Sequence, residues 1–259
     1  MPAEESLSVQ LYSLRLMPSL DEQLRLVRSC GLSFVEANSA CLDDAAGFRR
    51  LLDRHGLTAP GGHIGIDTLR DSPARAADLC ATIGINLLTL WGFPDAQELL
   101  TEEQWANAGE ELGVLAESLA GNGITFAFHN HDWELADFGK GRIALDVLFE
   151  AARGSPLRWQ ADLAWLARGH ANVGAITKRH RDLICACHIK DIAPGPRNAP
   201  EGGWADLGQG VLPWHDWWPK MKAYGARWMV LEHDAPSDPQ RFLTRSAAAA
   251  RAIDAETAS

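Results

Sequence analysis

The sequence predicts one α/β domain over residues 1–259, a (β/α)8 barrel of the TIM-barrel class. Three observations lead to this prediction. A chain of 259 residues with 46% hydrophobic content fits one barrel core better than two small domains. Eight short runs rich in Leu, Ile, Val, Phe and Thr alternate with segments of helical periodicity, as parallel strands joined by helices require. Glycines stand just before several of these runs, where a helix must end.

The eight predicted strands are short and mostly apolar. In chain order they span Leu7–Tyr12, Ser33–Ala37, Thr58–Ile64, Asn86–Trp91, Ile124–Asn130, Arg158–Asp162, Leu183–Lys190 and Arg227–Glu232. The segments between them carry apolar residues three and four apart, as at Leu20, Leu24 and Val27, which is typical of helices that cover a sheet.

Glycine and alanine mark the helix ends. Four predicted strands follow a glycine that suits a left-handed helix cap, namely Gly31, Gly56, Gly84 and Gly123. The run Ala247–Ala250 predicts the end of the final helix. An open doubly wound sheet is the alternative fold, but it usually has about five or six strands and a glycine-rich phosphate loop after the first, and no such loop is present.

The longest irregular stretch, Ala193–Pro213, follows the seventh predicted strand and is rich in proline and glycine. Loops of this length are usually functional or mobile. We therefore expect a functional loop at this position.

Composition and charge exclude several kinds of protein. No apolar run is long enough to cross a membrane, and Met1–Ser8 is acidic and polar, so we expect no membrane association and a cytoplasmic location. A formal net charge of −10 disfavours nucleic acid as a partner. Five cysteines at irregular positions predict reduced thiols. Cys185 and Cys187 suit a buried strand better than a soft metal site.

Polar side chains collect where the predicted strands end. In a barrel of this class the carboxyl ends of all strands share one mouth, so these side chains converge. The last four strands supply His129, Asn130, His131 and Glu134, then Asp162, then His188, Lys190 and Asp191, and finally Glu232 and Asp234. The first three strands supply Gln10, Tyr12, Glu36 and His63, which we expect to contact a substrate.

One divalent metal ion is predicted at this mouth. Imidazole and carboxylate ligands together suit Mn, Co, Fe, Zn or Mg. A single polar residue at a strand end is more often a helix cap or an ion-pair partner. Asp162, His188 and Glu232 end three successive strands, however, which makes coincidence the weaker explanation. Lys190 is expected to donate a hydrogen bond to a substrate oxygen, with pairing to Asp191 at the rim as the alternative.

The ten tryptophans suggest sugar stacking at some positions. Four of them lie near predicted strand ends or mouth loops: Trp91, Trp133, Trp165 and Trp204. We expect one or two of these to contact substrate and select Trp91 and Trp165. Trp214, Trp217 and Trp218 form a helix face that serves either internal packing or contact between subunits of a homo-oligomer.

Four motifs, taken in order, resemble the xylose isomerase-like barrel superfamily, whose members are often labelled sugar phosphate isomerase/epimerase. They are Val9–Arg15, His129-Asn130-His131 with Glu134, His188-Ile189-Lys190-Asp191 and Leu207–Gly210. The resemblance runs from the first strand to the last helix. It implies one divalent ion held by a Glu, an Asp, a His and a Glu from strands five to eight.

Three of these ligand positions correspond to Asp162, His188 and Glu232, and the first two are 26 residues apart, as in the superfamily pattern. At the strand-five glutamate position this chain carries His129, and Glu134 follows five residues later. The resemblance therefore implies that Glu134 or His129 is the fourth ligand. It also implies that Glu232 moves protons as well as binding metal, and that His131 or His129 acts as general base.

These expectations describe a metal-dependent sugar isomerase or epimerase that removes a proton next to a carbonyl, or a related keto-sugar lyase or dehydratase. The scarcity of Arg and Lys near the mouth favours an unphosphorylated sugar or keto-sugar. One alternative is a DNA-repair endonuclease of the same superfamily, which the acidic charge disfavours. The other is a sugar-binding barrel without turnover, and His129 in place of glutamate is its best support.

Overall fold

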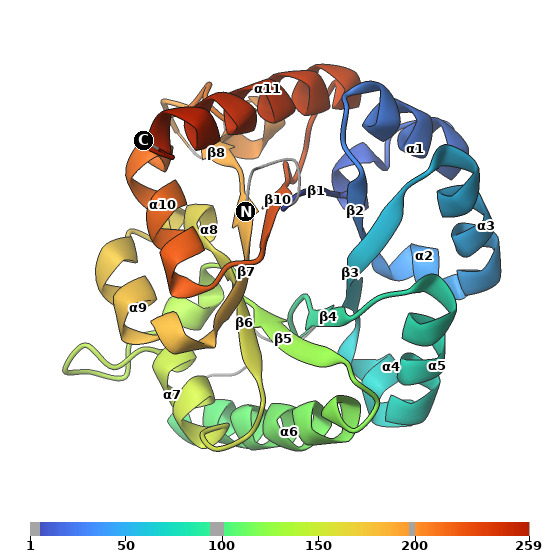
Figure 1. Cartoon of the computed structure of the whole chain (residues 1–259). Helices are drawn as coiled ribbons and strands as arrows, with labels where there is room; N and C mark the ends of the chain where they lie inside the picture. The colour runs from blue at the N-terminus through green and yellow to red at the C-terminus, as the bar shows by residue number, and fades with distance from the viewer. Residues whose placement is uncertain (1–5, 94–100, 197–199, 259) are drawn as a thin grey trace.

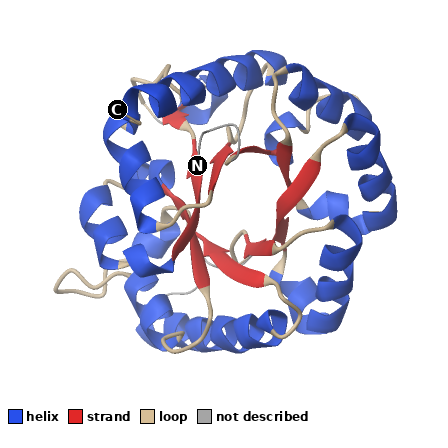
Figure 2. Ribbon diagram, in the orientation of Figure 1, coloured by secondary structure: helices blue, strands red, loops and turns tan. Residues whose placement is uncertain are grey.

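The computed structural model describes residues 6–93, 101–196 and 200–258. Eight parallel strands close into a barrel in the order β1-β10-β7-β6-β5-β4-β3-β2, which confirms the predicted fold class. Figures 1 and 2 look down this barrel and show the strands as an inner ring surrounded by helices. The barrel strands are β1 (Leu7–Gln10), β2 (Phe34–Ala37), β3 (Thr58–Ile64), β4 (Leu87–Leu90), β5 (Thr125–His129), β6 (Arg158–Asp162), β7 (Ile184–Ile189) and β10 (Trp228–Leu231).

The outer ring consists of helices that follow the strands in sequence. The α-helices are α1 (Leu20–Ser29), α2 (Ser39–Asp43), α3 (Ala45–His55), α4 (Ile66–Asp71), α5 (Pro73–Ile83), α6 (Glu102–Ala120), α7 (Ala144–Ala151), α8 (Leu163–Arg168), α9 (Val173–Arg179), α10 (Trp214–Tyr224) and α11 (Pro239–Thr257). Four short 3-10 helices span Leu11–Leu14, Trp133–Leu135, Arg181–Leu183 and Pro200–Gly203. No described helix is long and apolar enough to cross a membrane.

Helix α3 shows how the local sequence sets these elements. The Asp44 side chain accepts a hydrogen bond from the Gly47 N–H at 2.8 Å and so caps the first turn. Phe48 and Leu52 repeat at a four-residue spacing and bury one face against the barrel. Gly56 ends the helix at φ +62°, a left-handed conformation that favours glycine. The glycines predicted to cap the other helices likewise have positive φ angles.

Two local expectations need correction. Ala247–Ala250 lies in the middle of α11 and not at its end, because the helix continues to Thr257. The stretch after the seventh predicted strand is also more ordered than a simple loop. Two short strands, β8 (Asp191–Ile192) and β9 (Trp204–Ala205), pair antiparallel there and bring Trp204 back to the barrel.

Asp191 fixes this segment in place. Its Oδ1 accepts hydrogen bonds from the N–H groups of Ile192 and Leu212, and its Oδ2 accepts from Gly208 and Gly210, at 2.9 to 3.1 Å. The alternative of an Asp191–Lys190 ion pair is therefore wrong, because Asp191 binds backbone amides and Lys190 binds other carboxylates.

The barrel interior changes from apolar to polar along its axis. Near the amino ends of the strands, side chains such as Leu87, Ala186 and Val230 form a small apolar cluster. Two positions later along the same strands, the inward-facing residues are His188 and Glu232. Because strand side chains alternate, inward-facing positions two residues apart share this interior. The apolar layer closes one end, and the polar layer lies toward the mouth.

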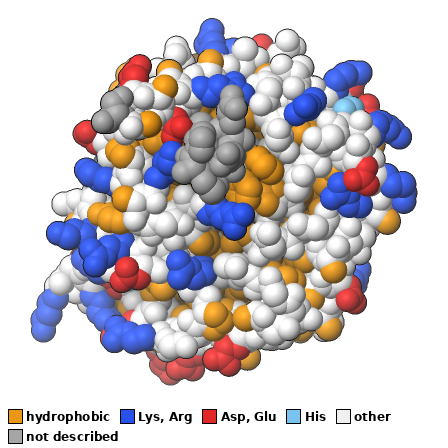
Figure 3. Space-filling view, in the orientation of Figure 1, with side chains coloured by type: hydrophobic (Ala, Val, Ile, Leu, Met, Phe, Trp, Pro, Cys, Tyr) orange, Lys and Arg blue, Asp and Glu red, His pale blue; other side chains and the backbone are white. Residues whose placement is uncertain are grey.

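Trp214, Trp217 and Trp218 lie on α10 in the outer ring, whereas Cys185 packs against the apolar cluster inside the barrel. Trp214 and Trp218 are buried against neighbouring elements, which supports internal packing for them, whereas Trp217 is only partly buried. Burial raises the pKa of the Cys185 thiol to about 12. Neither Cys185 nor Cys187 belongs to a group of potential metal ligands in the described part of the chain. The face drawn in Figure 3 shows Lys and Arg side chains both at its edge and nearer its middle, with Asp and Glu among them.

We predict that Asp191→Ala lowers the free energy of unfolding by about 2–4 kcal/mol, because it leaves several backbone N–H groups without their charged acceptor. Urea denaturation followed by circular dichroism measures this loss. Asp78→Ala on the exposed side of α5 is the control. Equal stability of the two variants would show that Asp191 does not hold the segment.

Candidate active site

Four buried side chains converge at the carboxyl ends of neighbouring strands. They are His129 on β5, Asp162 on β6, His188 on β7 and Glu232 directly after β10. Each offers a nitrogen or oxygen atom, and these atoms all lie within 4.8 Å of one another. Two imidazoles and two carboxylates at this separation fit a divalent ion. Asp162 Oδ2 accepts no well-aligned hydrogen bond within the described structure, and Lys190 Nζ lies 3.0 Å from it as an ion-pair partner.

Glu36 on β2 is the hub of a second group that lies directly beside the first. His188 Nε2 lies 2.6 Å from its Oε2, and His63 Nε2 lies 3.2 Å from the same oxygen. The side-chain amides of Gln10 and Gln160 each donate a hydrogen bond to this carboxylate. Glu36 is therefore occupied by protein partners, and His188 connects it to the four-residue group.

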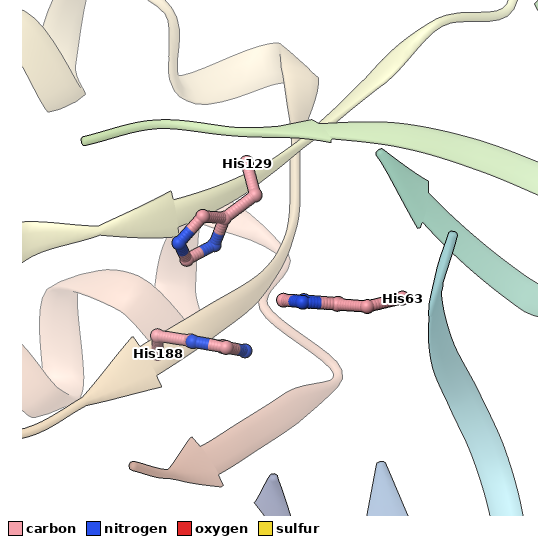
Figure 4. A group of neighbouring side chains, drawn as sticks. All are labelled: His63, His129 and His188. Atoms are coloured by element: carbon pink, nitrogen blue, oxygen red, sulfur yellow. The ribbon is translucent and has the colours of Figure 1, made fainter. Parts of the chain in front are cut away.

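Three imidazoles form the boundary between the two groups. Figure 4 shows His63, His129 and His188 turned toward one another from β3, β5 and β7. The rings of His63 and His188 stack in parallel with centroids 5.2 Å apart, and His129 meets His188 edge-on at 4.5 Å. The three side chains also make up a possible ligand group by themselves. Gln160 Oε1 joins His63 and His129, at 2.8 and 3.1 Å from their ring nitrogens.

Lys190 places a buried positive charge beside the four-residue group. Its side chain is fully buried, and its Nζ lies 2.5 Å from Glu232, 2.8 Å from Asp234 and 3.0 Å from Asp162. The indole rings of Trp165 and Trp204 lie on another side of the ammonium. Lys190 thus neutralises Asp162 and Glu232, two carboxylates of the four-residue group.

The charges of the site depend on one another. Burial opposes ionisation of Glu232, but Lys190 and His188 outweigh it and hold the pKa of that carboxyl well below its usual range. Burial likewise opposes the charge on His188, but Glu232 and Glu36 raise its pKa to about 10. For His129, burial and the neighbouring His188 hold the pKa well below the ordinary value, so this imidazole is neutral. A neutral imidazole is the form that binds metal, so His129 is ready to bind, whereas His188 would have to release its proton to an entering ion.

Glu134 lies outside the four-residue group. Its Oε2 accepts a hydrogen bond from the His131 N–H at 2.8 Å, and its Oε1 has no hydrogen-bond partner among the described residues. Burial raises the pKa of this carboxyl to about 8. His131 itself is neutral, because burial and the charge of Lys190 lower its pKa to about 3.

An aromatic wall borders the site, formed by His131, Trp133, Trp165 and Trp204. The His131 ring stacks on Trp133 with centroids 4.1 Å apart, and Trp165 meets Trp204 edge-on at 4.7 Å. Three buried ring nitrogens of this wall, one each from His131, Trp133 and Trp165, have no hydrogen-bond partner in the described residues. Buried polar atoms are usually paired, so these atoms indicate a surface that receives a polar ligand or water.

The remaining predicted substrate contacts divide into two sets. Gln10, Glu36 and His63 are buried in the network below the mouth. Tyr12 is 46% exposed under the guanidinium of Arg15, and Trp91 is partly buried beside Gly65. Neither belongs to the four-residue group.

Two arginines and one glutamine were missed by the sequence interpretation. Arg15 donates to the backbone carbonyl of Asp234, and Arg168 donates to that of Gly202, so cations besides Lys190 reach the mouth loops. Gln160 bridges Glu36, His63 and His129. Its position two residues before Asp162 on β6 would have placed it on the same inward face.

The sequence matches the family model described as xylose isomerase-like TIM barrel over residues 24–255. The chain belongs to this family. No curated protein matches it. His129 and the other polar residues described above lie at the carboxyl ends of the barrel strands.

Solved structures of similar fold include several enzymes. A sugar phosphate isomerase/epimerase from Parabacteroides distasonis is 15% identical, with a TM-score of 0.79 over 96% of this chain and 95% of that one. A probable 3-DHS dehydratase from Bacillus anthracis is 11% identical, with a TM-score of 0.75 over 94% and 97%. A xylose isomerase-like barrel from Mycobacterium smegmatis in complex with magnesium is 14% identical, with a TM-score of 0.74 over 100% of both chains. Identities this low establish the shared fold alone.

The raised pKa of Glu134 predicts a distinct effect on stability. Native Glu134 keeps its proton up to about pH 8, whereas the unfolded chain loses it near the ordinary value of 4.5, so rising pH destabilises the native state between these values. Glu134→Gln cannot lose that proton. The difference in free energy of unfolding, variant minus wild type, should therefore increase by about 1.4 kcal/mol per pH unit across this range.

Urea titrations of chelator-treated protein at several pH values between 5 and 8 measure this difference. The matched control is Glu117→Gln on the exposed face of α6. A difference that stays flat with pH for Glu134→Gln would mean that this carboxyl is already ionised in the native protein.

Proposed function

We propose that this chain is a divalent-metal-dependent isomerase or epimerase of a small keto-sugar, with elimination beside the carbonyl as the related lyase reaction. The observation that carries the proposal is the buried convergence of His129, Asp162, His188 and Glu232. These four residues would hold one ion of Mn, Co, Mg, Zn or Fe. When bound, such an ion polarises a carbonyl oxygen and so makes the adjacent carbon-bound proton more acidic.

His129 is the fourth ligand in this proposal, and Glu134 is left to move protons. Two observations support that assignment. His129 belongs to the convergent group, whereas Glu134 binds the His131 N–H and keeps a carboxyl oxygen without a partner. A carboxyl whose pKa is raised to about 8 is also matched to proton transfer near neutral pH. His131, with a pKa near 3, is the weaker base.

Glu36 acts as a positioning residue for the metal site. Its contact with His188 Nε2 leaves Nδ1 of the same ring facing Glu232, at 3.0 Å. A carboxylate on the far nitrogen of a ligand histidine fixes the orientation of the ring and raises its basicity. Gln10 and Gln160 hold that carboxylate in turn.

A polyhydroxylated, unphosphorylated substrate is supported by the groups around the mouth. The unpaired ring nitrogens of His131, Trp133 and Trp165 would bind hydroxyl groups, and the indole faces would pack against the C–H face of a sugar. Lys190 would donate to a substrate oxygen. Arg15 and Arg168 use part of their hydrogen-bonding capacity on backbone carbonyls of the mouth loops.

The proposal predicts metal-dependent proton exchange. Protein stripped with a chelator and reloaded with Mn²⁺ or Co²⁺ should incorporate solvent deuterium at the carbon next to the carbonyl of a 2-keto or 3-keto sugar, as measured by NMR. His129→Ala should slow this exchange by at least about 100-fold, since even loss of an outer partner of a metal site costs 10- to 100-fold. His215→Ala on the exposed side of α10 is the matched control and should exchange at the wild-type rate.

Other outcomes would support other functions. Sugar binding without deuterium incorporation in the presence of metal would indicate a binding barrel without turnover. Strongly salt-dependent affinity for abasic duplex DNA would favour the endonuclease alternative. Exchange that persists at the full rate after metal removal would contradict the proposal.

A further inference from the structure

Lys190 makes contacts that a substrate-binding lysine does not need. The side chain is fully buried, and three carboxylates surround its Nζ at 2.5 to 3.0 Å. Burying an ammonium group is costly unless nearby carboxylates compensate it. In the described structure the compensation comes from Asp162, Glu232 and Asp234.

Two of these partners are also proposed metal ligands. Asp162 Oδ2 and Glu232 Oε2 both point at the ammonium, and the same Glu232 oxygen faces His188 Nδ1 at 3.0 Å. A divalent ion at this group would need these oxygen atoms for itself. It would also repel an ammonium only a few ångströms away in a site with little water.

Lys190 has a second set of partners outside the metal group. Asp234 Oδ2 lies 2.8 Å from Nζ, and the rings of Trp204 and Trp165 have their centroids 4.9 and 5.3 Å from it. A carboxylate together with two indole faces is a favourable environment for a cation. The Asp234 side chain is 25% exposed, so this second environment lies toward the mouth.

We propose that Lys190 is an internal counter-cation that competes with the divalent ion for Asp162 and Glu232. Without metal, the ammonium holds both carboxylates in place. Metal binding would take Asp162 and Glu232 away from the ammonium and leave it on Asp234 and the two tryptophans, which it already contacts, with hydrogen-bond donors free for a substrate oxygen. Binding of the metal and the freeing of Lys190 N–H donors for the substrate are thereby coupled. This inference rests on the metal site of the proposed function.

Mn²⁺ affinity measured by calorimetry on chelator-treated protein tests the competition. Lys190→Met keeps much of the side-chain volume but removes the competing charge, so it should bind Mn²⁺ at least about tenfold more tightly than wild type. Asp234→Asn weakens the second environment, keeps the ammonium on the ligands and should bind Mn²⁺ more weakly. Arg168→Met removes an equal charge from the face of Trp204 without touching a ligand, and it should bind within about twofold of wild type.

Thermal unfolding separates competition from a purely structural role. Lys190→Met should melt below wild type without metal, because three carboxylates lose their cation, and Mn²⁺ should raise its melting temperature by more than it raises that of wild type. A purely structural lysine would lower both melting temperatures and leave the affinity equal or weaker.

Three results would overturn the inference: unchanged or weaker Mn²⁺ binding by Lys190→Met, unchanged or tighter binding by Asp234→Asn, or an equal gain for Arg168→Met and Lys190→Met. The last would indicate a general effect of charge. A wild-type protein that binds no Mn²⁺ would contradict the proposed function as well. If the wild type binds Mn²⁺, the three results above would contradict only the inference about Lys190.

Discussion

The structure depends on how three buried carboxylates share two cations. Glu36, Asp162 and Glu232 lie in the polar layer of the barrel with almost no exposure to water. His188 stands between Glu36 and Glu232, and Lys190 stands between Glu232 and Asp162. Breaking a buried pair by removing one partner strands a charge, which is far more costly than losing a surface pair. Each member of this chain of charges therefore fixes the position of the next.

The barrel makes this arrangement possible because it places an apolar layer below the charges and brings the carboxyl ends of all strands together. Side chains two residues apart on a strand face the same interior. On β7 this interior is apolar at Ala186 and polar at His188, one layer further along. Asp191 accepts hydrogen bonds from the N–H groups of Gly208 and Gly210 and so fixes the segment that follows Trp204. The site is thus built on rigid strands, and a clamped loop supplies the aromatic wall.

The sequence predicted the fold well because strand length, helical periodicity and glycine caps are local properties. All eight strands lie where the apolar runs indicated, within a few residues. It also placed Asp162, His188 and Glu232 at one mouth, because strand ends in a barrel converge. It could not predict that Glu36 meets His188 across 152 residues, or that Gln160 joins two histidines, because such contacts depend on register and barrel closure. That His129 joins the four-residue group while Glu134 binds the His131 N–H likewise depends on the path of the chain after β5.

The most direct test of this account is a crystal structure of the protein loaded with Mn²⁺, with anomalous scattering used to locate the ion. The account predicts a single strong peak bonded to His129, Asp162, His188 and Glu232, with Glu36 still on the far nitrogen of His188 and Glu134 still on the His131 N–H. An ion bound by Glu134 with His129 turned away, or a peak centred among His63, His129 and His188, would contradict it.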